Sequence, residues 1–207
     1  MRIAVIDYEV GNLANVYHAW RRLGEDPKIT RDPEVIRNAE LIELPGVGAI
    51  RDAMGNLEKF DLIPLLEEQV KAGKFFLGVC LGMQALFETD YEGGVYKGLG
   101  FLPGEIVPFH TQLKVPHMGW NELEFCQSHW LQEGLAAHPY AYFVHSYYMQ
   151  PEDKSIITAV CDYSARMPVA LQKGNAFAVQ FHPEKSGRVG LKILENFAKL
   201  GGDALVR

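Results

Sequence analysis

The chain has few cysteines and no long apolar segment. Its three cysteines (Cys80, Cys126 and Cys161) form an odd, widely spaced set without a CxxC pair, which argues against a disulfide framework and against a zinc knuckle. No apolar run approaches the roughly 18 residues that would suggest a transmembrane helix. The first residues, MRIAVIDYEVGN, lack the apolar stretch and cleavage site of a secretory signal. We therefore expect a cytoplasmic protein that does not cross a membrane.

Positive charge is scarce as well. Lysine and arginine number 20 against 26 aspartates and glutamates, so the formal net charge is -6. Because no basic stripe stands out along the chain, we do not expect a nucleic acid as partner. Hydrophobic residues make up 48% of the 207 positions, which is enough for one sizeable core. The sequence contains no linker and no repeat, so we expect a single domain over residues 1–207.

The first half of the chain alternates between strand and helix patterns. The apolar spacing predicts strands over residues 2–8, 28–30, 39–48 and 75–79, and helices over 12–23 and 61–72. Gly24 and Gly73 follow these helices, as a terminating glycine commonly does, and Asp61 is a candidate N-cap. Repeated β-α-β units of this kind predict a parallel sheet with helices on both faces.

In the second half, glycines and prolines separate short apolar runs. Strands are expected over residues 104–109, 121–125, 141–148, 155–163, 168–174 and 175–181, and a helix over 190–200 closes the chain. Because short loops join several of these strands, this half should be partly antiparallel.

A cysteine framed by two glycines stands out within FLGVCLGMQALFE, residues 76–88. An apolar strand runs into Gly78, and an apolar helix is expected to follow Cys80. A nucleophile on a sharp strand-to-helix turn needs small neighbours so that its side chain can protrude. The N–H groups that begin the helix would favour a thiolate there. Taken alone, the G-x-C-x-G pattern of residues 78–82 fits a buried structural cysteine beside turn glycines equally well.

Two further segments contain what a cysteine nucleophile would need. In QFHPEKS, His182 and Glu184 are two residues apart, so on an extended chain they would point the same way. The carboxylate could then orient the imidazole while the imidazole deprotonates a thiol. The alternative is a strand end broken by Pro183, with Glu184 beginning a helix.

LPGVGA (44–49) ends a predicted strand, where glycines let N–H groups face an oxyanion. A phosphate-binding loop is the weaker alternative because no GK[ST] or GxxG follows.

The cysteine, the His-x-Glu segment and the PGVG strand end together resemble the class I (triad) glutamine amidotransferases. The resemblance implies a flavodoxin-like, doubly wound, mostly parallel sheet with added antiparallel strands in the C-terminal half, and it implies no metal and no cofactor. It also implies that Cys80 attacks glutamine and forms a thioester, that His182 transfers the protons, and that Glu184 orients His182. By resemblance, the oxyanion donors lie at Gly46, Val47, Gly48 and Leu81, and the glutamine contacts at Gln84, His145, Ser146 and Tyr147. From the residues alone, Gln84 is more simply a polar residue of the helix, and residues 142–148 are an aromatic core strand.

Three more segments resemble one branch of that family. They are VIDYEVGNLANV (5–16), VPHMGWN (115–121) and YFVHSYY (142–148). In that branch the glutaminase is a separate subunit that passes ammonia to a (β/α)8 cyclase subunit, in a heterodimer. The resemblance places the docking face near Asn12, Asn15, Trp120 and Lys185. The alternatives are that Trp120 belongs to the core and that Asn12 is a helix cap.

The chain departs from the family pattern at two positions. Ile50 stands where an aromatic is frequent, and Glu9 where a small residue is usual. At Ile50 we expect a packing adjustment with activity kept.

The assignment of the whole chain has three alternatives. The first alternative is a glutaminase subunit that serves anthranilate, aminodeoxychorismate or pyridoxal phosphate synthesis. The second is a non-catalytic docking protein of the same fold. The third, a cysteine hydrolase or chaperone of a related fold, would lack the His-x-Glu of residues 182–184.

Overall fold

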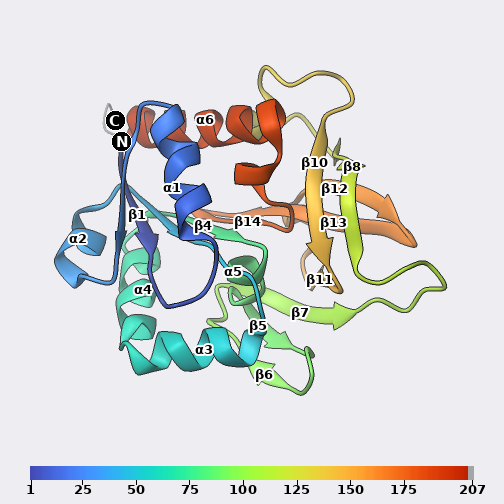
Figure 1. Ribbon diagram of the computed structural model, residues 1–207, viewed down its shortest axis with the longest axis horizontal. Coiled ribbons are helices and arrows are strands. Elements are labelled where there is room, and N and C mark those ends of the chain that lie inside the picture. The colour runs from blue at the N-terminus through green and yellow to red at the C-terminus, as the bar shows by residue number, and fades with distance from the viewer. Residues whose placement is uncertain (205–207) are drawn as a thin grey trace.

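An eight-stranded sheet forms the centre of the computed structural model, which describes residues 1–204 (Figure 1). Five neighbouring strands of this sheet run parallel. In spatial order they are β2 (Asp26–Thr30), β1 (Arg2–Ile6), β3 (Leu41–Leu44), β4 (Phe75–Val79) and β14 (Ala176–Val179). This is the 2-1-3-4-5 order of a flavodoxin-like, doubly wound sheet. The predicted fold class is therefore confirmed.

Antiparallel strands make up most of the C-terminal half. The main sheet continues through β13 (Ala165–Lys173), β12 (Ile157–Tyr163) and β9 (Glu124–Phe125). A second sheet contains β11 (Tyr147–Pro151), β7 (Leu102–Pro108), β5 (Phe87–Asp90) and β6 (Tyr96–Lys97). Strands β8 (His117–Glu122) and β10 (Tyr140–His145) form a two-stranded ribbon at the right of Figure 1. The prediction of added antiparallel strands is confirmed.

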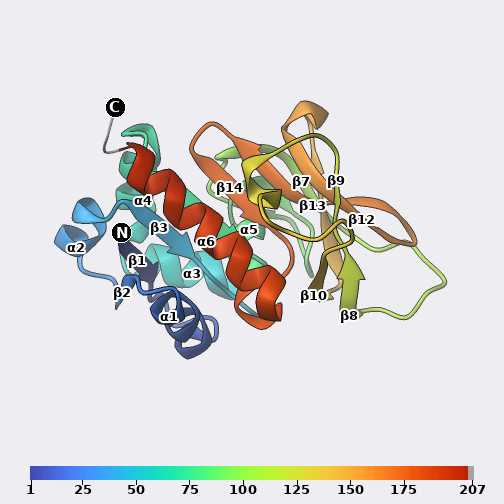
Figure 2. The same cartoon turned by 90° about the horizontal axis from the view of Figure 1, so that it is seen from above.

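Helices cover both faces of the parallel strands (Figures 1 and 2). One face carries α1 (Leu13–Arg22) and α6 (Gly187–Ala204), and the other carries α2 (Pro33–Asn38), α3 (Ile50–Lys59) and α4 (Leu62–Lys71). Each face has its own apolar cluster, with Trp20 and Val5 buried in the first and Leu66 and Phe76 in the second. The sheet therefore separates two cores, as both-face coverage of a parallel sheet requires. Every helix within residues 1–204 is too short or too polar to cross a bilayer.

The helix ends follow the sequence signals with one exception. Asn12 caps α1 by accepting a hydrogen bond from the backbone N–H of Asn15 at 3.2 Å. Gly24 and Gly73 follow their helices with φ of 84° each, the left-handed conformation that glycine adopts without a steric penalty. Asp61 does precede α4, but its side chain makes no capping hydrogen bond. The predicted N-cap role of that side chain is wrong.

Several predicted boundaries in the second half are wrong. The apolar helix expected after Cys80 is a single turn, α5 (Leu81–Gln84). The carbonyls of Ala85 and Leu86 then accept hydrogen bonds from Leu99 and Leu102 at 2.7 and 2.9 Å, which draws the chain into the second sheet. The strand expected over 141–148 is divided at Ser146, whose carbonyl accepts a hydrogen bond from the backbone of Phe109. The strand expected over 121–125 is divided between β8 and β9.

Candidate active site

Cys80 occupies a strained turn at the carboxyl end of β4. Its backbone has a φ of 53° and a ψ of -110°, a conformation that typically costs about 1–3 kcal/mol for a residue with a side chain. Its N–H donates to the carbonyl of Val179 at 2.9 Å, and its carbonyl accepts from the N–H of Gln84 at 3.0 Å. Because a structural cysteine gains nothing from such strain, this geometry favours a nucleophile.

The two glycines beside Cys80 are required by close packing. A Cβ at Gly82 would overlap the carbonyl oxygen of Leu44 on the neighbouring strand. A Cβ at Gly78 would lie 2.8 Å from the side chain of Leu86. The turn can therefore be this tight only because both positions lack a side chain, as the G-x-C-x-G pattern predicts.

His182 and Glu184 form a buried pair next to the turn. The imidazole Nδ1–H donates to Oε1 of Glu184 at 2.9 Å, and the two side chains are 2% and 5% exposed. The sequence offered an extended chain over residues 182–184 or a helix beginning at Glu184. Both are partly wrong, because Pro183–Lys185 form a 3-10 turn. The turn still brings the two side chains together. The carboxylate fixes the tautomer, which leaves Nε2 as the nitrogen available to a substrate or a thiol.

The imidazole of His182 is adapted to carry a positive charge. Burial disfavours that charge, but Cys80 and Glu184 together outweigh it and raise the pKa of His182 to about 9. Nε2 has no other hydrogen-bond partner among the described residues, and the Cys80 sulfur is the larger of the two causes that raise the pKa of His182. The site can therefore hold an imidazolium beside the sulfur at neutral pH, and a neighbouring imidazolium is a typical activator of a cysteine nucleophile.

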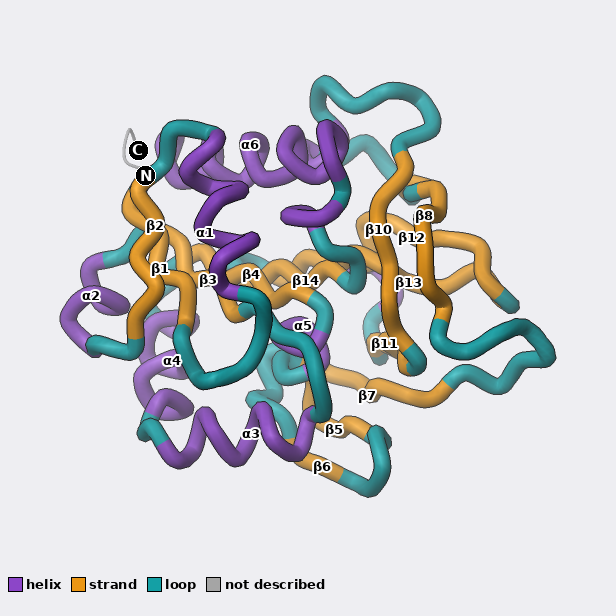
Figure 3. Tube along the Cα trace, viewed as in Figure 1, coloured by secondary structure: helices purple, strands orange, loops and turns teal. Residues whose placement is uncertain are grey.

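The PGVG segment lies directly beside Cys80, where the loops that follow β1 and β3 approach α5 (Figure 3). The backbone N–H of Leu81 donates to the carbonyl of Gly46 at 3.4 Å. Tyr8, which is fully buried, donates its hydroxyl hydrogen to the carbonyl of Pro45 at 2.6 Å. The expected oxyanion donor at Leu81 is thus occupied by a protein carbonyl, and an incoming oxyanion would have to displace it.

A cavity of about 280 Å³ opens beside Cys80. At about 30 Å³ per water molecule it has room for about nine waters, which suits one amino acid and not a polymer. The predicted residues that line it are Val47, Gly48, Leu81, Gln84, His145, Ser146 and Tyr147. Gly46, the remaining predicted residue, lies behind them, with Tyr8 and Leu81 so near that a Cβ would clash. The structure thus brings the predicted substrate segments to one place.

Sequence reasoning missed Glu92, whose side chain also lines this cavity. Its Oε2 accepts the backbone N–H of Ile50 at 2.9 Å, which fixes the carboxylate at the start of α3. Burial, opposed by that hydrogen bond, raises the pKa of Glu92. A half-buried carboxylate of this kind suits the α-ammonium group of an amino acid. Ile50 is fully buried; the packing adjustment expected there stays a prediction.

The imidazole of His145 is engaged within the protein at both nitrogens. Nδ1 donates to the carbonyl of Tyr147 at 2.8 Å, and Nε2 lies 2.9 Å from Nδ1 of His117. Asn121 in turn lies 3.3 Å from Nε2 of His117. Burial lowers the pKa of His145 to about 3, so the ring is neutral. His145 is therefore placed to hold the Ser146–Tyr147 backbone at the cavity, which both residues line.

The predicted docking residues lie on the surface near this site. Trp120 is 56% exposed, so the alternative that it belongs to the core is wrong. Its ring meets that of Tyr142 edge-on, with 6.2 Å between centroids, and Nζ of Lys185 lies 5.9 Å from the centre of the Tyr142 ring. Asn12 and Asn15 are exposed at the start of α1, and Asn12 is also the helix cap that the alternative predicted.

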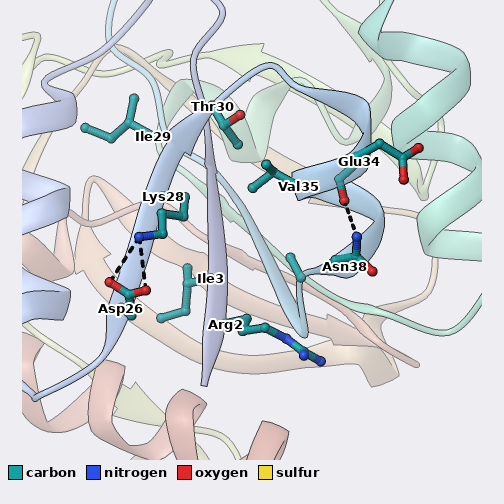
Figure 4. Close-up of a pocket in the computed structure, with 10 residues that line it drawn as sticks. Arg2, Ile3, Asp26, Lys28, Ile29, Thr30, Glu34, Val35 and Asn38 are labelled. Carbon is teal, nitrogen blue, oxygen red and sulfur yellow. Dashed lines mark hydrogen bonds and ion pairs between the residues drawn. The ribbon is translucent and has the colours of Figure 1, made fainter.

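A larger hollow of about 490 Å³ lies at the opposite edge of the sheet (Figure 4). It runs along the edge strand β2 from Asp26 to Thr30, beside α2, whereas Cys80 follows the carboxyl end of β4. Its polar side chains pair locally: Lys28 with Asp26 at 3.1 Å, and Asn38 with the carbonyl of Glu34 at 2.8 Å. Because open α/β sheets bind ligands beyond the carboxyl ends of their strands, the smaller cavity is the better candidate site.

Comparison with known proteins agrees with the geometry of this site. Residues 4–200 match the family described as glutamine amidotransferase class-I. Curated relatives include imidazole glycerol phosphate synthase subunit HisH of Moorella thermoacetica, 46% identical over 96% of this chain and 94% of the relative. The protein of the same name from Aquifex aeolicus is 44% identical over 96% of this chain and 97% of the relative.

Solved structures support the fold. A crystal structure described as a glutamine amidotransferase aligns with a TM-score of 0.77 and 20% identity, and covers 98% of this chain and 100% of its own. The structure of PurLQS from Thermotoga maritima also aligns with a TM-score of 0.77, at 18% identity, over 96% of this chain and 98% of its own.

Proposed function

Because the chain belongs to the class-I glutamine amidotransferases, we propose that it is the glutaminase subunit of an imidazole glycerol phosphate synthase in histidine biosynthesis. The observation that carries this proposal is the strained Cys80 beside the buried His182–Glu184 pair, at a cavity the size of one amino acid. The similarity to HisH subunits over nearly the whole chain supports the choice of complex.

The proposed reaction starts with the Cys80 thiolate, which attacks the side-chain amide carbon of glutamine. The tetrahedral intermediate then breaks its C–N bond, and the nitrogen takes a proton from the His182 imidazolium and leaves as ammonia. Water attacks the remaining thioester while His182 accepts its proton, and glutamate and the thiolate are released. Glu184 keeps the imidazole in the tautomer that both steps need.

The oxyanion site must form before this reaction can be fast. Each backbone donor to a tetrahedral oxyanion is typically worth about 3 kcal/mol in the transition state, and the N–H of Leu81 is bound to Gly46 in this structure. Rotation of the Gly46–Val47 peptide would free Leu81 and turn the Val47 N–H toward the site. Gly48, with a φ of 121° and no neighbour nearer than the Leu81 side chain, 4.0 Å from where a Cβ would lie, can absorb that rotation at low cost.

Glutamine would be held by groups on three elements. The carboxylate of Glu92 would bind the α-ammonium group, the amide of Gln84 would bind the polar head group, and the Ser146–Tyr147 backbone would complete the contact. These groups surround Cys80 in one cavity, so they fix the amide carbon near the sulfur. Positioning of this kind supplies much of the catalytic effect in a bimolecular reaction.

A partner is needed because free ammonia is mostly protonated, and no longer nucleophilic, in neutral water. We place the (β/α)8 cyclase on the face that carries Asn12, Asn15, Trp120 and Lys185. Met118 and Tyr140, at 63% and 48% exposed, extend the apolar surface along the same ribbon as Trp120. Exposed aromatic residues in such a patch are typical anchors of protein interfaces.

Glutamate release tests the assignment. It should be measured for this chain alone, with a candidate cyclase, and with the cyclase plus its nucleotide ligand. We expect near-silence alone and strong release in the full mixture, abolished by Cys80→Ala. Full activity without a cyclase would keep the glutaminase chemistry but assign the chain to another complex, such as those for anthranilate or pyridoxal phosphate. Failure of a diazo-ketone glutamine analogue to label Cys80 would favour a non-catalytic docking protein.

A further inference from the structure

Gln180 is a buried amide next to the nucleophile, and the mechanism above gives it no role. The residue is 1% exposed and directly follows β14. Its side-chain Nε2 lies 3.9 Å from Sγ of Cys80 and is oriented to donate to the sulfur. The backbone fixes this arrangement, because the N–H of Gln180 donates to Val169 and the carbonyl of Val179 accepts from Cys80, both at 2.9 Å.

An amide at this position is unfavourable for stability alone. Its Oε1 is buried and has no hydrogen-bond partner among the described residues. Burial of an amide group with an unsatisfied oxygen destabilises a fold, whereas a leucine or methionine would fill the same space without that cost. The sulfur is the one side-chain partner that the amide has within the described part of the chain, so the chemistry of the sulfur accounts best for an amide here.

We propose that Gln180 is a catalytic residue that stabilises the Cys80 thiolate through a hydrogen bond from its side-chain amide. The inference rests on the proposed function only in taking Cys80 as the nucleophile. Hydrogen bonds to an ionised acceptor are stronger than those between neutral groups, so the amide favours the thiolate over the thiol.

A second donor is useful because the first one changes during the reaction. His182 gives its proton to the departing ammonia and then accepts a proton from water, so it is neutral or charged in different steps. The amide of Gln180 keeps its donor throughout. It can therefore stabilise the sulfur both before the attack on glutamine and when the thioester breaks and the thiolate leaves.

The test is the pH dependence of Cys80 alkylation in the free, full-length chain. Iodoacetamide is a small neutral probe that reacts with the thiolate. The parent should carry Cys126→Ser, because Cys126 is exposed, whereas Cys161 is buried. The variants are Gln180→Leu, which removes the donor, and Gln180→Glu, which keeps the shape and replaces the donor by a carboxylate. Gln69→Leu, at a buried amide on α4, is the matched control.

We expect Gln180→Leu to raise the pH midpoint of alkylation by about half to one unit, a loss of about 3–10-fold in thiolate below the midpoint. Gln180→Glu should raise it further, and Gln69→Leu should leave it unchanged. An unchanged midpoint in Gln180→Leu would overturn the proposal. So would a lower midpoint, which would mean that the amide oxygen accepts the thiol proton.

Two further measurements keep the outcome clear. Circular dichroism shows whether each variant folds, and Gln180→Met, with an unbranched side chain of similar length, replaces Gln180→Leu if the latter does not fold. Alkylation needs neither glutamine nor a cyclase. A chain that releases no glutamate even with the cyclase and its nucleotide ligand, but shows the expected midpoint shift, would refute the proposed function and leave the role of Gln180 intact.

Discussion

Glu43 gives the sharpest stability prediction, because it is a carboxyl group in the middle of the parallel sheet. It lies on β3, between β1 and β4, and is 2% exposed. The indole N–H of Trp20 donates to its Oε2 at 2.5 Å. Burial, opposed by this hydrogen bond and aided by the negative charge of Glu184, raises the pKa of Glu43 to about 8. The group is therefore protonated at neutral pH in the folded protein.

The size and sign of the effect of pH on stability follow from the pKa of Glu43 in the folded and in the unfolded protein. In the unfolded chain Glu43 has its ordinary pKa of 4.5, about 3.5 units below the folded value. Each unit corresponds to about 1.4 kcal/mol, so ionisation of Glu43 destabilises the fold by up to about 5 kcal/mol. Between these two values the folded state holds a proton that the unfolded state has released. The stabilisation is complete below the unfolded pKa and is lost as the pH rises through the folded pKa.

Glu43→Gln should remove this pH dependence and keep an oxygen that accepts from Trp20. Urea unfolding should give similar free energies for variant and parent near about pH 5, and a variant more stable by about 3–5 kcal/mol near about pH 8. Glu58→Gln, at an exposed position of α3, controls for the loss of one charge. An equal difference between variant and parent at both pH values would refute the reasoning, because it would mean that Glu43 does not titrate on folding.

Four further outcomes are expected. Glu92→Gln should raise KM for glutamine by about 10–100-fold with little change in kcat, because a charged contact worth about 1.5–3 kcal/mol is lost. Gly48→Val should reduce the stimulation of glutamate release by the cyclase's ligand, since a β-branched residue resists the φ of 121°; unchanged stimulation would argue against the peptide rotation. Gly82→Ala should lower the free energy of unfolding by about 1–3 kcal/mol, because its Cβ overlaps Leu44, whereas Gly55→Ala, which meets open space within α3, should raise it by about 0.5–1 kcal/mol. The kcat/KM of the assembled complex for glutamine should fall above about pH 9, as His182, whose pKa is raised to about 9 in the free enzyme, loses the proton that ammonia needs.

Most of the parallel half of the fold could be predicted because its information is local. The parallel strands, α1 and α4 each have their own apolar period, and the glycines after α1 and α4 mark their ends, whereas α2 and α3 were not predicted. The proximity of Cys80, His182 and Glu184 could be predicted for a related reason. Parallel strands expose their carboxyl ends at one edge of the sheet, so residues that follow β4 and β14 must come close even though Cys80 and His182 are far apart in sequence.

The features that could not be predicted depend on partners remote in sequence. The role proposed for Gln180 depends on a sulfur that is 100 residues away in the sequence, and nothing in the local pattern of β14 indicates that contact. In the sequence Glu43 looks like an ordinary polar position. Its burial depends on the pairing of β3 with β1 on one side and β4 on the other. Glu92 follows a strand that was expected to be helix, so its place at the cavity was missed with the strand. A carboxylate next to two glycines, in YEGG, was the signal that could have marked it.

The hydrogen bonds around the triad give docking and activation separate physical routes. Trp120 pairs across the ribbon with Tyr142, and the carbonyl of Tyr142 accepts the backbone N–H of His182 at 3.0 Å. Ser186 strengthens this link, because its hydroxyl accepts the N–H of Tyr142 at 2.9 Å and donates to the carbonyl of His182 at 2.6 Å.

The oxyanion segment has different neighbours. It is held by Tyr8 and Leu81, and the loop before α1 approaches it so closely that a Cβ at Gly11 would lie 3.3 Å from Cα of Gly46. In the docking proposed above, a partner bound at Trp120 would act on the backbone of His182, whereas a signal that frees Leu81 would arrive through the loop that ends at Asn12. It follows that loss of the Trp120 contact should weaken the complex without removing the response of the assembled complex to the partner's ligand.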